Sequence, residues 1–135
     1  MVRALVQDYA TFGADLPDDT VEQGGEIVKP GGANIAEHLR AALARTGLAP
    51  RSVGRHAHYG WAFEVPVESV MVWCMIQYVD PWLLITEVPS RFVHRLLGRR
   101  PDEKHAGVLN VLRPVLAGAP FSDCRWTTKA VYLAR

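Results

Sequence analysis

Hydrophobic and polar positions alternate with a period of two along residues 55–65. This alternation is typical of a β-strand with one buried face, because successive side chains of a strand point to opposite sides. The aromatic members of the run would share the core face; they are Tyr59, Trp61 and Phe63. The polar members would share the other face; they are His56, His58 and Glu64. The pattern therefore predicts a strand over 55–65.

Two more strands are predicted directly after this one. Residues 69–79 are apolar on both faces, which is typical of a central strand that is covered on both sides. Residues 82–88 follow a turn at Asp80-Pro81 and are again apolar. Consecutive strands with short connections run antiparallel, so we expect these three strands to form a meander.

Helical spacing of apolar residues predicts a first helix over 35–46, with Asn34 as its N-cap. A short second helix is predicted over 91–97, with its apolar residues Phe92, Val93, Leu96 and Leu97 facing inward. A third helix should begin at Pro101 and be kinked or divided at Pro114. Branched and aromatic residues over 125–133 predict a last strand.

The predicted order of elements is thus α-βββ-αα-β. It indicates an α+β fold, in which an antiparallel meander of about four strands carries helices on one face. Residues 8–33 are acidic and rich in glycine and proline, and we expect an irregular segment packed on or flanking the body of a single domain, 1–135. The layout resembles small bacterial chaperone and toxin-immunity domains, a likeness of architecture that does not fix a function.

Composition narrows the class of protein. The chain has 135 residues, of which 49% are hydrophobic and 21% charged, as in a soluble globular protein. The apolar runs are too short to cross a membrane and the first residues do not form a signal peptide, so we expect a cytoplasmic protein without membrane contact. Two cysteines do not make a disulfide framework.

The formal net charge of +1 conceals an uneven distribution. Six acids and two bases give residues 1–33 a net charge of −4, whereas eight acids and thirteen bases give residues 34–135 a net charge of +5. The acidic segment could lie against the basic body, or it could leave that body free for an acidic partner.

The His-x-His spacing of His56 and His58 is one that can bind a divalent transition metal, with Glu64 further along the same face. A metal site needs a third protein ligand, so without one we expect no cofactor and two solvated histidines. Gly60 interrupts the bulky residues of the strand. It either marks the close approach of a ligand or another backbone, or makes room for an aromatic neighbour such as Trp73.

Arginines dominate the cluster of basic residues between Arg91 and Lys104. Arg91 and Arg95 are four residues apart and share a helix face, and Arg99, beyond the predicted end of the helix, could continue the same line. Nucleic-acid phosphates or an acidic protein surface are candidate partners. The near-zero net charge and the absence of a nucleic-acid-binding motif argue against nucleic acid as a partner. A solvated helix face is the favoured interpretation.

No complete catalytic motif is present, neither a Gly-x-Ser-x-Gly elbow nor a P-loop. The glycine turn before Asn34 could at most cradle an anion. We therefore predict a small protein-interaction module, of the immunity, chaperone or adaptor kind, that binds a protein partner or itself as a homodimer. The alternatives are a metal-binding protein or small enzyme that uses His56, His58 and Glu64, and a weak nucleic-acid binder that uses the Arg91–Lys104 cluster.

Overall fold

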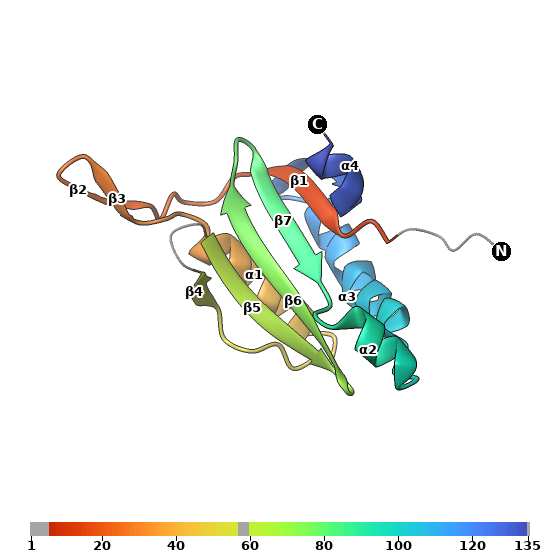
Figure 1. Ribbon diagram of the computed structural model, residues 1–135. Helices are drawn as coiled ribbons and strands as arrows, with labels where there is room; N and C mark the ends of the chain where they lie inside the picture. The colour runs from red at the N-terminus through yellow and green to blue at the C-terminus, as the bar shows by residue number, and fades with distance from the viewer. Residues whose placement is uncertain (1–5, 57–59, 135) are drawn as a thin grey trace.

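The structure is a computed structural model that describes residues 6–56 and 60–134. It contains a six-stranded antiparallel sheet with the order β4-β5-β6-β7-β1-β8, and helices pack against it (Figure 1). The strands of the sheet are β1 (Tyr9–Ala14), β4 (Gly54–His56), β5 (Gly60–Val67), β6 (Val70–Tyr78), β7 (Trp82–Glu87) and β8 (Phe121–Thr127). The remaining elements are the hairpin β2 (Val21–Gln23) and β3 (Glu26–Lys29), and the helices α1 (Ala33–Ala44), α2 (Arg91–Leu96), α3 (Pro101–Leu116) and α4 (Lys129–Leu133).

The central meander of β5, β6 and β7 confirms the predicted antiparallel sheet. Cys74 of β6 lies opposite Phe63 of β5 on one side and Thr86 of β7 on the other. The core-facing side chains of β6 are fully buried because α1 and α3 cover this face of the sheet. Burial raises the pKa of the Cys74 thiol to about 12, so this cysteine is a small core residue rather than a thiolate.

The number and order of the strands differ from the prediction, chiefly within residues 8–33. This segment was predicted to be irregular, yet it contains β1, β2 and β3. The side chains of Ala10 and Phe12 are buried, and β1 lies between β7 and β8 in the sheet. The alternation in β1 is short and is followed by dense turn signals, so the sequence pattern alone did not distinguish a strand from a loop.

The predicted strand over 55–65 is also wrong, because the chain reverses direction within it. His56 of β4 lies opposite Gly60 of β5, so these residues belong to two paired strands. His58 and Tyr59 lie outside the described residues. Trp61 and Phe63 are buried on the core face as predicted. The reversal was missed because Gly60 is the turn-forming residue nearest to it, and the alternation on both sides of Gly60 favoured one continuous strand.

Helix α1 begins at Ala33, and Asn34 is not its N-cap. The carboxylate of Asp19 instead accepts hydrogen bonds from the main-chain N–H groups of Gly32, at 2.8 Å, and of Asn34, at 3.0 Å. A carboxylate is favoured there by the free N–H groups and by the helix dipole. The acidic segment is thus fastened to α1, and its own carboxylate occupies the anion position predicted for the glycine turn.

The end of the chain differs from the predicted strand over 125–133. Strand β8 ends at Thr127, and α4 begins at Lys129. The hydroxyl of Thr128 accepts a hydrogen bond from the N–H of Val131 and so caps this helix. Helix α3 continues through Pro114 without a division.

Candidate functional site

Helix α2 buries none of its residues. Its large apolar side chains are exposed to 69% at Phe92, 50% at Val93 and 70% at Leu96, and the capping residue Leu97 is exposed to 57%. We call these four residues the α2 face. The prediction that they face inward is wrong. A contiguous apolar patch of this kind on a soluble protein usually marks a contact surface.

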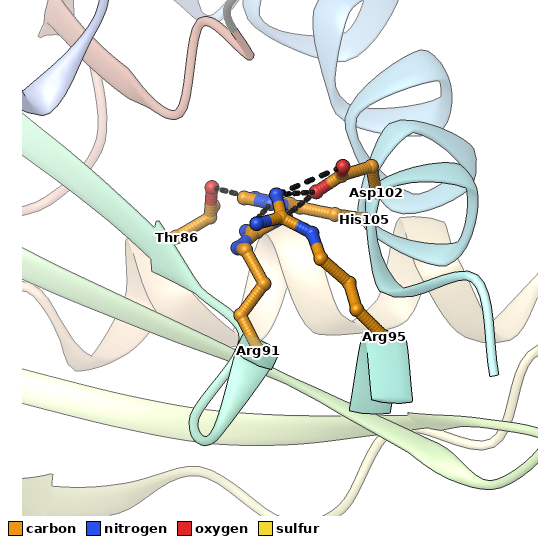
Figure 2. Close-up of polar contacts among 5 residues, drawn as sticks. All are labelled: Thr86, Arg91, Arg95, Asp102 and His105. Atoms are coloured by element: carbon orange, nitrogen blue, oxygen red, sulfur yellow. Dashed lines mark hydrogen bonds and ion pairs between the residues drawn. The ribbon is translucent and has the colours of Figure 1, made fainter. Parts of the chain in front are cut away.

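The orientation of α2 is the reverse of that of an ordinary surface helix. Its four apolar residues form one stripe at helical spacing, and Arg91 and Arg95 lie on the opposite side. Figure 2 shows that both arginines point toward the first turn of α3. The polar side of α2 therefore contacts the body of the protein, and the apolar side faces solvent.

Asp102, in the first turn of α3, is the residue that holds both arginines. Its carboxylate accepts hydrogen bonds from Arg91 and from the Nη2 of Arg95, the latter at 3.0 and 3.1 Å (Figure 2). Partial burial acts to raise the pKa of Asp102, but the hydrogen bonds and charges of Arg95 and Arg91 outweigh it and lower that pKa. The carboxylate is therefore charged at neutral pH, and it bridges α2 to α3.

His105, one turn further along α3, connects this ion-pair group to the sheet. Its side chain is completely buried. The hydroxyl of Thr86 donates to the carbonyl oxygen of Asp8 at 2.8 Å and lies 2.6 Å from the Nε2 of His105. Because the hydroxyl has a single proton, Nε2 must be the protonated nitrogen and must donate to Thr86.

The other ring nitrogen of His105, Nδ1, is then an acceptor. It lies 2.6 Å from the Nη2 of Arg91, which donates to it. Burial first, and then the charges of Arg91 and Arg113, lower the pKa of His105 to about 4, against an opposing effect of Asp102. The imidazole is therefore neutral at physiological pH. With both nitrogens bonded and no exposed surface, it positions Arg91 and has no access to a ligand in solvent.

The sequence did not indicate that His105, Asp102 and Thr86 belong to one site. One signal for two of them was available: Asp102 and His105 are three residues apart and share a face of α3. The partnership of that face with Arg91 depends on how α2 and α3 are placed by the chain between them, which sequence spacing does not reveal.

The residues of the predicted metal site do not lie on one strand. The ring of His56 packs edge-on against Trp73, with centroids 5.3 Å apart. His56 pairs with Gly60 of β5, and Glu64 lies four residues further along that strand. The carboxylate of Glu64 forms an ion pair with Arg51 at 3.3 Å. In the part of the chain that the structure describes, no three His, Cys, Asp or Glu side chains could hold a metal ion. His58 lies outside it, and the metal site stays a prediction.

Gly60 occupies a position where the main chain of a neighbouring strand comes close. A Cβ atom there would lie 2.1 Å from the carbonyl oxygen of Ile76. Of the two interpretations that the sequence left open, the geometry therefore favours the close approach of another backbone over room for an aromatic ring.

The predicted basic cluster is largely paired with carboxylates. Besides Arg91 and Arg95 on Asp102, Arg100 pairs with Glu103 at 3.4 Å and Lys104 with Glu68 at 3.0 Å. The guanidinium of Arg99 contacts the Nδ1 of His94 at 3.4 Å. These ion pairs reduce the positive charge that would be available to a nucleic acid, and nucleic-acid binding stays a prediction.

A cleft of about 520 Å³ lies at the base of the β2–β3 hairpin. Tyr78 and Trp82 form one wall, with their ring centroids 4.9 Å apart. Ile27 of the hairpin also contributes to the lining. Two polar lining residues already bond within the chain: Asp19 caps α1, and the amide of Asn34 donates to the carbonyl of Pro17. These two polar groups thus support the walls of the cleft.

Comparisons with family models, with curated proteins and with solved structures find no match for this chain. None of the helices in the described part of the chain has the length and apolar character needed to cross a membrane.

Proposed function

We propose that this protein is a small interaction module that acts by binding another protein chain through the α2 face. The observation that carries the proposal is the orientation of α2, whose arginines are bonded to the body while its leucines face solvent. An exposed helix that merely finished the fold would bury its apolar stripe. Here a partly buried polar network, anchored on the buried His105, holds the helix in the opposite orientation.

The composition of the α2 face suits a protein interface. Phe92 offers an aromatic anchor at the exposed side of the helix, and binding hot spots are enriched in aromatic and arginine residues. Full burial of one such apolar side chain is worth about 1.5–3 kcal/mol. Covering four partly exposed ones is thus a substantial driving force even after the entropic cost of association.

A protein partner fits this surface better than a nucleic acid does. The centre of the surface is apolar, and phosphates gain nothing from burying it. The two arginines nearest to it, Arg91 and Arg95, are already bonded to Asp102. Arg99, exposed just beyond Leu97, would steer an acidic protein surface toward the α2 face.

The proposal is tested by the native size of the tagged protein in a gently prepared cell lysate, compared with that of Leu96→Asp. Val131→Asp is the matched control, because Val131 is also a large apolar residue, exposed to 58%, on another short helix. We expect an assembly larger than the monomer for the wild type and the control, and a monomer for Leu96→Asp. A monomeric wild type, or an unchanged assembly in Leu96→Asp, would contradict the proposal.

A further inference from the structure

We infer that the occupant of the α2 face is the β2–β3 hairpin of a second copy of the same chain, so that two copies exchange hairpins in a symmetric dimer. This inference rests on the proposed function and names its partner. It is carried by the hairpin's exposure, by its charge and by its place in the fold.

The hairpin is a second apolar element without a surface to cover it. Every residue of β2 and β3 is exposed, including Val21 at 41%, Ile27 at 61% and Val28 at 39%. The two strands form a sheet of their own, separate from the main sheet. A two-stranded hairpin is at best marginally stable in water, so a docking surface would stabilise it.

The hairpin and the surroundings of the α2 face carry opposite charges. Glu22 and Glu26 form no ion pair among the described residues, and Lys29 is the only base in the two strands. The segment 91–104, which contains α2, holds five bases against the two acids Asp102 and Glu103. Arg99, two residues beyond the end of the apolar stripe, is exposed. The acidic, partly apolar hairpin thus complements an apolar face that lies in a segment of net positive charge.

The position of the two elements favours a reciprocal dimer. The hairpin projects from one end of the molecule, whereas α2 lies at the opposite end (Figure 1). A hairpin therefore cannot cover the α2 face of its own chain. Two copies placed antiparallel about a two-fold axis would bring each hairpin to the α2 of the other, and the arrangement would close with two identical contacts.

Packing of α2 against α2 is the competing symmetric arrangement. It would also bury the leucines, but it would bring together two copies of the segment 91–104, which has a net positive charge. Like charges at an interface are unfavourable, so the acidic hairpin is the better complement.

The test uses the purified full-length chain in sedimentation velocity over a wide range of concentrations. We expect the wild type and Val131→Asp to dimerise, and Ile27→Asp and Leu96→Asp each to be monomeric with unchanged circular dichroism. An equimolar mixture of Ile27→Asp and Leu96→Asp should associate again. In this mixed dimer the native hairpin of the Leu96→Asp chain meets the native α2 of the Ile27→Asp chain, and the dissociation constant should be at least about tenfold lower than that of either variant alone.

Other outcomes overturn the inference in distinguishable ways. A dimer that tolerates Ile27→Asp but not Leu96→Asp would indicate α2–α2 packing. A dimer that tolerates both variants would place the interface elsewhere, and a mixture that stays monomeric would exclude reciprocal exchange. A purified wild type that is monomeric throughout overturns the hairpin as occupant, while the proposed function stands if the assembly in lysate still depends on Leu96.

Discussion

The Nη2 of Arg91 in α2 lies 2.6 Å from the Nδ1 of His105 in α3. This contact links two sets of hydrogen bonds: one runs from His105 through Thr86 to the carbonyl of Asp8, and the other joins Arg91 to Asp102. The orientation of α2 follows from it. Since the arginine side of the helix is bonded to the body, its apolar side must face outward.

The first prediction concerns the buried imidazole. His105→Ala should lower the free energy of unfolding by about 2–4 kcal/mol, because it opens a cavity and leaves the Thr86 hydroxyl and the Arg91 guanidinium without their partner. His94→Ala, on the more exposed α2, is the control and should change it by about 0.5 kcal/mol or less. Urea unfolding measures both. Equal effects of the two substitutions would count against a structural role of the network.

The second prediction is a dependence of stability on pH. The pKa of His105 is lowered from 6.5 to about 4, so between these values the unfolded chain binds a proton that the folded chain does not. The contribution of His105 to the free energy of unfolding is fully present above pH 6.5, its pKa in the unfolded chain. It is lost as the pH falls through about 4, its pKa in the folded chain, and the whole loss is roughly 3 kcal/mol. Asp102, whose pKa is also lowered, adds a loss of the same sign at lower pH.

As the pH is lowered across this window, the free energy of unfolding of the wild type should therefore decrease. It should decrease less in His105→Gln, because glutamine cannot titrate. Identical pH profiles for the two proteins would show that His105 is not the group responsible.

The third prediction separates binding from folding. Phe92→Ser and Leu96→Asp should change the free energy of unfolding of the monomer by about 0.5 kcal/mol or less, because these side chains make little contact in the fold. Leu109→Ala, in the fully buried side of α3, should cost about 2–5 kcal/mol. Denaturant titration at high dilution gives the comparison. A large loss for Leu96→Asp would mean that the α2 face supports the fold.

The fourth prediction concerns the close approach of β5 and β6. Gly60→Ala would place its Cβ 2.1 Å from the carbonyl oxygen of Ile76, and relieving this overlap should cost about 1–3 kcal/mol. Gly107→Ala, on α3 with no atom within 4 Å of the new Cβ, should instead stabilise the protein by about 0.5–1 kcal/mol. Thermal melts of the two variants should shift in opposite directions. A shift in the same direction would contradict the assigned strand register.

The meander of β5, β6 and β7 was predictable because β5 alternates between apolar and polar residues, while β6 and β7 are apolar runs joined by short turns. Strand β1 was not, since its partners β7 and β8 are distant in sequence and stabilise it only once the sheet has formed. Helical spacing correctly grouped the apolar residues of α2 on one side. It did not reveal which side faces the body, because the deciding partners, Asp102 and His105, belong to another helix.

The most direct test of the central claim is photocrosslinking in living cells from a photoreactive residue placed at position 96, with the same residue at position 131 as the reference. We expect a discrete protein adduct from position 96, formed with the chain itself or with another protein, and none from position 131. No adduct from position 96, or the same adducts from both positions, would contradict the claim that the α2 face is a protein-docking surface.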